Sequence, residues 1–453
     1  MIEEILSYTS KYKAANKKQS RKLKGQFFTS PRTALYMAQT VAYKADHLSI
    51  LDPGCGNLIL AASTIEYSIM HNLCFNFTIT AVENDPVIGR DLSFLCNIIS
   101  NYVQRNGGTV GFNIIHDNFI THHFDSNFDI VICNPPYKKL RKDSIEAESM
   151  SDIVYGQPNL YGLFMAKGLS LLRNHGRFSY ITPRSWASGQ YYSLLRKFLF
   201  QTIDIEDIVL FEKRDNVFKG EQVLQETMIT AGTKKVSNNC NIKIHTVAGD
   251  FCDYIDSIAV SSESILDSGE WHCLLLPTSE SDLRILSRMN SIRSNLKSLG
   301  YSFKTGPVVE FRNASYLSVE PFDNSVPMIR ASNIVDGHYV FPSSVEKAQY
   351  VSAAATHLLI KNAPTVFVKR ITAKEEKRRI QSCVYSPSDT TPYISVENHV
   401  NYLARLDGKP LSLDEVEYVN QVLSSSDYDS YYRIIGGSTQ VNSNELNYLP
   451  FSM

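Results

Sequence analysis

The amino-acid sequence contains no run of apolar residues approaching the roughly 18 that a membrane-spanning helix requires. Its start is polar and rich in lysine, without the apolar stretch of a secretory signal peptide. The eight cysteines are scattered and form no C-x-x-C pair, which argues against a zinc site or a disulfide framework. These absences predict a cytoplasmic protein with reduced thiols and no metal.

An excess of one charge is also absent. The 453 residues carry a formal net charge of −1 at pH 7, from 45 Lys and Arg against 46 Asp and Glu. Any surface for a polyanion must therefore be a local basic patch that acids elsewhere offset. The length suits two domains, and the hydrophobic content of 43% is ordinary for a globular protein.

A short apolar strand ends in an unusual turn. Residues 128–133 are mostly apolar and are followed by Asn134, Pro135, Pro136 and Tyr137. The two prolines fix the backbone and donate no N–H, so the turn is stiff and its carbonyls are bare. Asn134 adds a side-chain acceptor, and Tyr137 adds a flat ring. The combination suits a planar amino group such as that of adenine, although alone it also fits an ordinary strand-ending turn.

Three earlier strands, at 48–51, 77–82 and 111–115, also end in polar residues. The first leads through a glycine-rich loop into an apolar helix, which is the opening of a Rossmann-like βαβ unit. The residues after these strands are Asp52, Pro53, Gly54, Cys55, Gly56 and Asn57; Glu83 and Asn84; and Asp117, Asn118 and Phe119. Ligands of open α/β sheets bind beyond the carboxyl ends of the strands, so four polar ends in succession predict one site.

The rest of the chain divides into two parts. Alternating helices and strands continue to about residue 234, with a helix capped by Thr29 or Ser30 near the start. Short β runs and Ser/Asn-rich linkers then replace them. We predict an α/β catalytic domain over 1–240 and a mixed α+β domain over 241–453. Residues 1–24 would form a basic N-terminal arm, either a solvated helix or a contact to phosphates.

Taken in order, these segments resemble the gamma-type DNA adenine-N6 methyltransferases of bacterial restriction–modification systems, of the TaqI and PstI kind. The matching segments are residues 25–31, the Asp52 loop, Glu83, Asp117 with Phe119, residues 134–137, residues 159–162, and Val217 with Phe218. One departure is Leu58, which stands where the family loop usually has its last glycine. The resemblance implies a Rossmann-like class I methyltransferase domain that uses S-adenosylmethionine, followed by a target-recognition domain for double-stranded DNA.

The resemblance also implies roles for single residues at the cofactor. Phe28 and Thr29 would approach the methionine carboxylate, and the loop from Asp52 to Gly56 would hold the amino-acid portion. Glu83 would accept hydrogen bonds from the ribose hydroxyls, and Asp117 one from the adenine amino group. Phe119, Asn84, Asn118 and Asn134 would complete the cofactor site.

On the substrate side, an adenine inside a duplex must be flipped out before it can react. Tyr137 and Phe218 would then stack on the base, while the side-chain oxygen of Asn134 and the carbonyl of Pro135 would accept its amino hydrogens. In the second domain, the run 369–379 carries six basic residues against two acids. Its candidate DNA contacts are Lys369, Arg370, Lys374, Lys377 and Arg378, although a charge run is more often a solvated face.

Such a methylase would work in the bacterial cytoplasm, associated with the nucleoid, and its partner would be a separate cognate restriction endonuclease. Other substrates fit the same turn, because an RNA base or a protein glutamine also presents a planar nitrogen. A second domain of this size and the order of the motifs favour DNA. A cytosine-N4 methylase would more often have Ser at the position of Asn134. A DNA-binding module with a vestigial cofactor fold would not need an intact turn.

Overall fold

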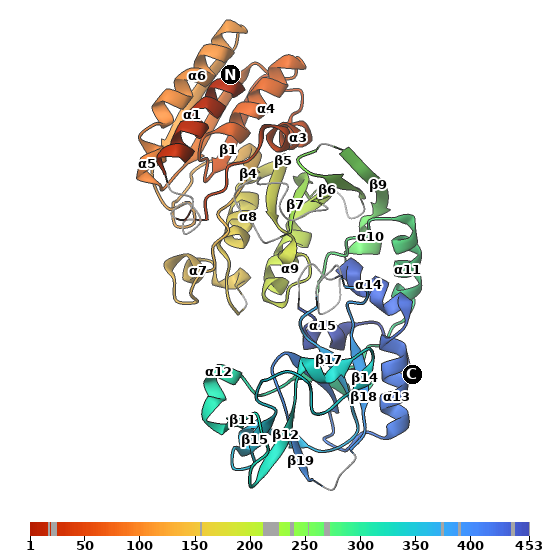
Figure 1. The fold of residues 1–453 in the computed structure, drawn as a ribbon. Coiled ribbons are helices and arrows are strands. Elements are labelled where there is room, and N and C mark those ends of the chain that lie inside the picture. Colours follow the sequence, from red (N-terminus) through yellow and green to blue (C-terminus); the bar gives the residue numbers. More distant parts are fainter. Residues whose placement is uncertain are drawn as a thin grey trace. The chain divides into compact units, whose positions relative to one another are not determined.

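The computed structural model describes residues 1–16, 19, 25–154, 156–211, 226–235, 240–251, 253–266, 272–372, 376–387, 391–435 and 440–452. The chain divides into two compact units, Met1–Ser279 and Glu280–Met453 (Figure 1). The first unit holds the predicted βα alternation, and the second holds the shorter strands.

The first unit is built on one sheet of nine strands in the order β3-β2-β1-β4-β5-β7-β6-β8-β9. The strands are β1 (Leu48–Pro53), β2 (Asn76–Val82), β3 (Thr109–Ile115), β4 (Phe128–Cys133), β5 (Leu172–Pro183), β6 (Ile203–Phe211), β7 (Thr227–Lys234), β8 (Asn241–Ala248) and β9 (Asp253–Ser261). Strands β1 to β5 are parallel, and β7 runs antiparallel to β5 and β6. The predicted open α/β sheet is confirmed, and the carboxyl ends of β1 to β4 meet at one edge.

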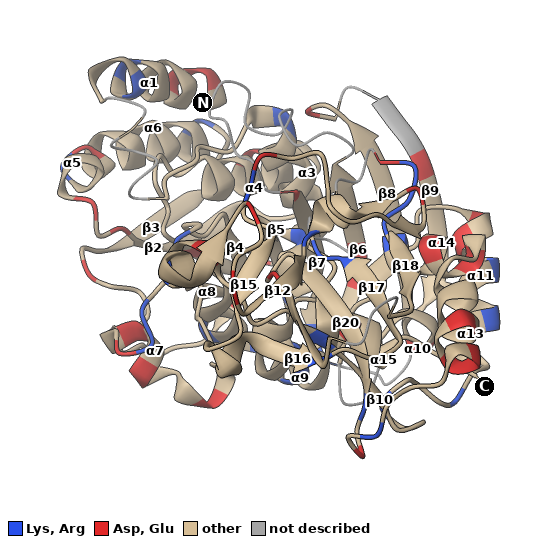
Figure 2. Cartoon of the chain, turned by 60° about the horizontal axis from the view of Figure 1, so that its bottom comes forward, with Lys and Arg blue, Asp and Glu red and all other residues tan. Residues whose placement is uncertain are grey.

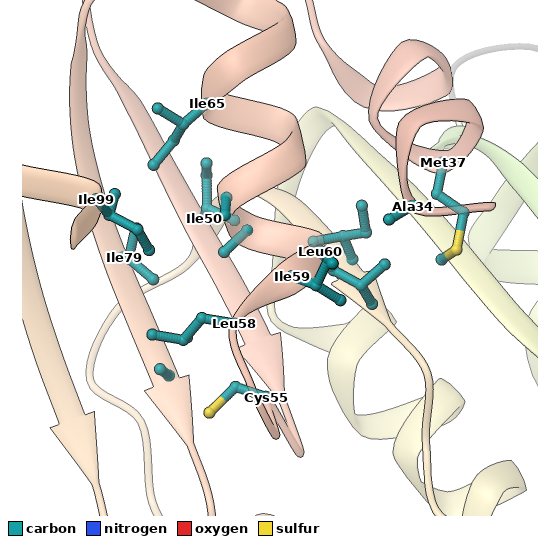
Figure 3. Packing of buried hydrophobic residues seen from close by; sticks show 14 of the residues in the cluster. Ala34, Met37, Ile50, Cys55, Leu58, Ile59, Leu60, Ile65, Ile79 and Ile99 are labelled. Atoms are coloured by element: carbon teal, nitrogen blue, oxygen red, sulfur yellow. The ribbon is translucent and has the colours of Figure 1, made fainter. Parts of the chain in front are cut away.

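Helices pack against this sheet from both faces. They include α3 (Pro31–Val41), α4 (Ile59–Met70), α6 (Leu92–Arg105), α8 (Leu160–Ser170) and α9 (Ser193–Thr202). Side chains alternate across a strand, so Ile130 and Ile132 join the apolar cluster of α4, whereas Val131 lies against Gly168 of α8. Figure 3 shows the first cluster, in which Ile50 and Ile79 of the sheet meet Ile65 of α4.

The predicted N-terminal arm begins with a docked helix. Helix α1 (Ile2–Ala15) contacts α4 and α6 and buries Ile5, Thr9 and Tyr12. Thr9 Oγ1 accepts a 2.5 Å hydrogen bond from Asn57 Nδ2, which ties α1 to the glycine-rich loop. The apolar residues at helical spacing thus dock α1 on the domain, although the segment that follows is basic. Five of the seven basic residues between 11 and 24 lie at positions 17–18 and 20–24, outside the described residues.

The predicted domain boundary at residue 240 differs from the division at residues 279 and 280. The reason is strand pairing, because β8 runs parallel to β6 and β9 pairs antiparallel with β8. These two strands extend the catalytic sheet instead of opening the second unit. The change of sequence pattern after residue 234 reflects a switch from βα units to a β hairpin.

The described residues of the second unit form three sheets, with strand orders β10-β20-β17-β18, β11-β15-β12-β19-β16 and β13-β14. Their longer strands are β10 (Tyr301–Thr305), β12 (Ser325–Ile329), β17 (Thr365–Lys369), β18 (Ser382–Tyr385), β19 (Tyr393–Val396) and β20 (Val400–Arg405). The longer helices are α11 (Glu280–Asn290), α13 (Leu413–Leu423), α14 (Ser426–Ile435) and α15 (Ser443–Tyr448). The mixed α+β character agrees with the prediction. In the described part of the chain, no helix has the length and apolarity to cross a membrane.

Leu58, the residue in place of the expected glycine, immediately precedes α4. Its backbone is left-handed, with φ 60° and ψ 16°, and its side chain is fully buried in the cluster of Figure 3. The left-handed region disfavours residues with a Cβ atom by about 1–2 kcal/mol. The loop therefore keeps the backbone of a glycine, and the burial of the leucine side chain offsets the strain.

This conformation reverses the usual order of stability, in which an alanine variant is more stable than a glycine variant. Both Leu58→Ala and Leu58→Gly remove the buried side chain, but only glycine also relieves the left-handed backbone. We expect Leu58→Gly to be the more stable of the two by about 1 kcal/mol in urea unfolding. Glu66 in the middle of α4 is the matched control: there Glu66→Gly should be less stable than Glu66→Ala by about 1 kcal/mol. The same order at both positions would contradict the strained backbone.

Candidate functional site

The polar strand ends predicted from the sequence surround one cavity of about 350 Å³ at the carboxyl edge of the sheet. The predicted residues that line it are Phe28, Thr29, Gly54, Cys55, Gly56, Glu83, Asn84, Asp117, Asn118, Phe119, Asn134 and Pro136. Asp52, Pro53, Pro135 and Tyr137 are their chain neighbours and do not themselves line it. Segments that are far apart in the sequence thus converge as predicted.

The side chain of Asn134 has a fixed orientation. Its Nδ2 donates to the carbonyl of Phe27 at 2.8 Å and to Oγ1 of Thr29 at 3.0 Å. Its Oδ1 is buried and has no hydrogen-bond partner among the residues that the structure describes. Because both N–H groups are used on the 27–29 segment, the amide can offer only its oxygen to a ligand. An unsatisfied buried acceptor is costly unless a ligand donates to it.

Tyr137 is held by its hydroxyl and by its neighbours. The hydroxyl donates to the carbonyl of Ile181 at 3.1 Å, and the ring lies 5.5 Å from that of Phe27 and 6.2 Å from that of Tyr161. Burial raises the pKa of Tyr137 well above its usual value, so the phenol stays neutral. Gly25, with φ 70°, packs so closely that a Cβ atom would lie 3.0 Å from the Tyr137 nitrogen. The two segments therefore form one rigid wall.

Glu83 is a buried carboxylate that organises two loops. Its Oε2 accepts from the backbone N–H of Gly56 at 3.0 Å, and its Oε1 accepts from that of Asp85 at 2.8 Å. Burial raises the pKa of Glu83 despite these donors. Glu83 lines the cavity and can accept further hydrogen bonds, since a carboxylate can accept about four. The predicted role toward hydroxyl donors is compatible with this geometry and stays a prediction.

Asp52 lies under the glycine-rich loop and is almost completely buried. Its Oδ2 has no hydrogen-bond partner in the described part of the chain. Desolvation raises the pKa of Asp52 well above its usual value, the backbone hydrogen bond from Ala61 lowers it, and the neighbouring Glu83 charge adds to the increase. An unpaired buried carboxylate of this kind favours a cationic occupant of the cavity.

Asp117 sits at the exposed end of the cavity. Its Oδ2 is 2.9 Å from Nδ1 of His122, and this hydrogen bond lowers the pKa of Asp117. The amino group of Lys167 donates to the carbonyls of Ile120 at 2.6 Å and of His122 at 2.5 Å. The loop that carries Asp117 is thereby fastened to α8.

Phe119 in the same loop is buried and packs on Phe164 of α8, with 4.9 Å between the ring centres. It forms an apolar surface beside Asp117, and its predicted contact with the ring of the cofactor stays a prediction.

Several site residues were missed by the sequence reasoning. Gln26 donates to Asp85 at 2.6 Å, and Asp85 also caps the short helix α5 (Pro86–Gly89). Asn118 donates to Glu146 of α7 (Ile145–Ser149) at 2.9 Å. The sequence signal for Gln26 and Asp85 was present, because both flank motifs that were identified. Contacts such as those of Glu146 and Lys167 depend on tertiary packing, and no local pattern announces them.

The predicted DNA contacts of the second unit are only partly free. Arg370 donates from its guanidinium to the carbonyl of Asn398 at 3.1 Å, and Arg378 to that of Ser425 at 3.2 Å. The neighbouring Arg379 is fully buried over the ring of Tyr432. Lys369 and Lys377 remain accessible to solvent. Lys374 and Phe218 lie outside the described residues, so their roles stay predictions.

Comparisons with known proteins lead to the same type of enzyme. Residues 88–218 match the family of the Eco57I restriction-modification methylase. The type II methyltransferase M.PstI of Providencia stuartii is 28% identical over 451 residues, which cover 94% of this chain and 86% of that protein. M.BsuBI of Bacillus subtilis is 26% identical over 439 residues, covering 94% and 87%. The chain is a DNA methyltransferase of the restriction–modification type. Its cofactor is S-adenosylmethionine.

Two solved structures share the fold of this methyltransferase. One is a nuclease-deletion mutant of the Type ISP restriction-modification enzyme LlaGI, with a TM-score of 0.55 and 12% identity over 94% of this chain and 45% of that one. The other is a DrdV–DNA complex, with a TM-score of 0.50 and 12% identity over 92% and 53%. At this identity the likeness concerns the fold alone, and it confirms the predicted class.

Replacing the buried carboxylate of Asp52 should stabilise the folded protein and weaken cofactor binding. Its pKa is raised on folding, so the charged form destabilises the folded protein as the pH rises above about 4, the value in an unfolded chain. We expect Asp52→Asn to increase the free energy of unfolding of the cofactor-free methyltransferase, with a larger gain at pH 8 than at pH 5. Its affinity for S-adenosylmethionine should fall. Urea unfolding at both pH values and calorimetric titration measure the two effects.

Asp46→Asn, on the exposed segment before β1, is the matched control and should show no gain that grows with pH. Equal or lower stability of Asp52→Asn at pH 8 would contradict the buried, unpaired carboxylate.

Proposed function

We propose that this methyltransferase transfers the methyl group of S-adenosylmethionine to N6 of an adenine flipped out of duplex DNA. The observation that carries the proposal is Asn134, whose amide nitrogen is occupied and whose oxygen is unpaired. Together with the Pro135 carbonyl, this fixed acceptor suits an amino group, which has two N–H donors. A hydroxyl offers only one donor and a tertiary amine offers none.

The cavity residues fit the cofactor by their chemistry. The carboxylate of Glu83 lines the cavity and is an acceptor for hydroxyls, and the buried carboxyl group of Asp52 beneath the glycine-rich loop favours a nearby ammonium group. The glycine-rich loop bends through Gly54 and Gly56, with φ 69° and 52°, where side chains would face Phe164 and Phe28. Asp117 and Phe119 supply an acceptor and an apolar floor at the other end. When bound, S-adenosylmethionine supplies an electrophilic methyl group on a sulfonium.

The wall around Asn134 raises the nucleophilicity of the target nitrogen. The lone pair of N6 is delocalised into the adenine ring, so this nitrogen is a poor nucleophile. Hydrogen bonds to Asn134 Oδ1 and the Pro135 carbonyl localise the lone pair on nitrogen and stabilise the positive charge that develops there. Because the amide is already oriented by Phe27 and Thr29, little reorganisation is needed during transfer.

Stacking supplies the second part of base recognition. Tyr137 is held in place by Ile181, Phe27 and Tyr161 and would offer its ring to the extruded adenine. A base–aromatic contact is worth about 1–3 kcal/mol, which is comparable to the few kcal/mol that unstacking costs. Phe218 would stack on the opposite face. We assign no covalent intermediate to the reaction.

The enzyme would work in the bacterial cytoplasm on DNA, alongside a separate cognate restriction endonuclease. The second unit would read the target sequence. Within the predicted run, Lys369 and Lys377 are its accessible basic candidates, and Lys374, outside the described residues, stays a candidate as well. A structured RNA substrate is the alternative, because the same wall would accept an RNA base.

A direct test uses tritiated S-adenosylmethionine with unmethylated genomic DNA or structured RNA, followed by nucleoside digestion and single-molecule sequencing. We expect label in N6-methyladenine at one short DNA motif. Label in RNA alone would show that RNA, and not DNA, is the substrate. Label in N4-methylcytosine would show that the target base is cytosine.

The role of the Asn134 oxygen predicts a specific kinetic defect. Asn134→Ala should lower kcat by on the order of 10²–10³, the usual loss when one preorganised hydrogen-bonding group is removed from a transition state. Binding of S-adenosylmethionine and DNA should change little. Asn101→Ala, on the exposed face of α6, is the control and should methylate normally. Single-turnover methylation measures the defect, and normal transfer by Asn134→Ala would refute the assigned chemistry.

A further inference from the structure

A second basic segment begins directly after the turn that would hold the target base. Residues 138–142, Lys-Lys-Leu-Arg-Lys, here called the lysine strip, follow Tyr137 without a gap. The predicted DNA contacts in the second unit use a different run of the chain. Figure 2 shows basic residues on the segment that leads to α7 and acidic residues on α7 itself.

The lysine strip is fixed to the catalytic wall. The carbonyl of Lys138 accepts from the N–H of Leu160 at 2.8 Å, and the N–H of Leu140 donates to the carbonyl of Pro158 at 3.0 Å. Lys139 and Asn159 form an antiparallel bridge between these bonds. Leu140 is buried, so the strip is anchored by its apolar residue as well as by its backbone. Its lysines are therefore positioned relative to Tyr137.

The strip presents its charges in alternating directions. Lys138 and Leu140 both line the cofactor cavity, so the intervening Lys139 lies on the opposite side of this extended segment. Lys139 and Lys142 are exposed and have no hydrogen-bond or ion-pair partner in the described part of the chain. No acidic side chain in the described part of the chain neutralises the charges of these two lysines.

The acids that follow have other partners or lie farther along the chain. Asp143 accepts from Arg141 at 2.9 and 2.6 Å, and Glu146 accepts from Asn118 at 2.9 Å. Glu148 and Asp152 lie in or beyond α7. Within the strip, only Arg141 has its charge paired. Lys139 and Lys142 are therefore left as free cations beside the active site.

We propose that Lys139 and Lys142 bind the DNA phosphates that flank the flipped nucleotide, an inference that rests on the proposed function. An extruded base stays attached through its sugar to two phosphates, so the turn that holds the base brings them near. Lys139 is two residues beyond Tyr137, at most about 7 Å along an extended chain. The lysine strip thus grips the backbone locally and independently of sequence, while the second unit reads the motif.

The test compares the double variant Lys139→Ala/Lys142→Ala with wild type in fluorescence anisotropy, using a labelled duplex of mixed sequence over a range of salt concentrations. Each phosphate contact contributes about 0.9 to the slope of log affinity against log salt. We expect the double variant to bind more weakly and its slope to be shallower by about 2. Lys139→Arg/Lys142→Arg keeps both charges and should restore the wild-type slope.

Lys44→Ala is the matched control, because Lys44 is exposed and precedes β1 at the opposite edge of the sheet. Unchanged affinity for S-adenosylmethionine verifies the fold of each variant. A slope equal to that of wild type and Lys44→Ala would overturn the inference, and normal N6 methylation by the same variant would show that the proposed function stands. If the wild type fails to methylate DNA while the double variant still has a shallower slope, the phosphate contacts would stand and the proposed function would be wrong.

Discussion

Two hydrogen bonds from the Asn134 amide nitrogen, to Phe27 and Thr29, fix which atom of this side chain is left for a ligand. They turn a side chain with both donors and acceptors into a pure acceptor. The 27–29 segment must therefore be as well placed as the strand that carries Asn134. That placement comes from Gly25, which lets the segment touch the Tyr137 backbone, and from Ser30, whose side chain caps α3. The orientation of the Asn134 amide is thus a property of two distant segments acting together.

Buried carboxyl groups gather at the cofactor cavity. Asp52, Glu83 and Asp85 are all buried at its edge, and desolvation raises the pKa values of Asp52 and Glu83. Such a pocket favours a cation over a neutral molecule of the same shape. S-adenosylmethionine carries a sulfonium charge that is lost when the methyl group leaves. Under the proposed function, these carboxylates would therefore favour the cofactor over the product, which lacks the sulfonium charge.

The sequence predicts best what periodicity and strand-end chemistry control. Strand β4 ends at Cys133 as expected, Ser30 caps α3, and the polar strand ends meet at one cavity. Features that depend on tertiary competition were not predictable. Helix α1 docks through Ile5 and Tyr12 although its neighbourhood is basic, and Arg379 is buried although it belongs to a charge run. Strands β8 and β9 join the first sheet because their partner β6 lies there, which composition cannot reveal.

The N-terminal cap of α3 depends on a residue far along the chain. Oδ1 of Asp250 accepts hydrogen bonds from Ser30 at 2.5 Å and from Thr33 at 2.9 Å, across 220 and 217 positions. During synthesis, the ribosome releases the motif segments of the cofactor site long before Asp250 emerges. The segment that orients Asn134 therefore gains its last support only after more than half of the polypeptide has been made. The hydrogen bonds around the start of α3 are therefore complete only when residues from both the beginning and the far end of the first unit are present.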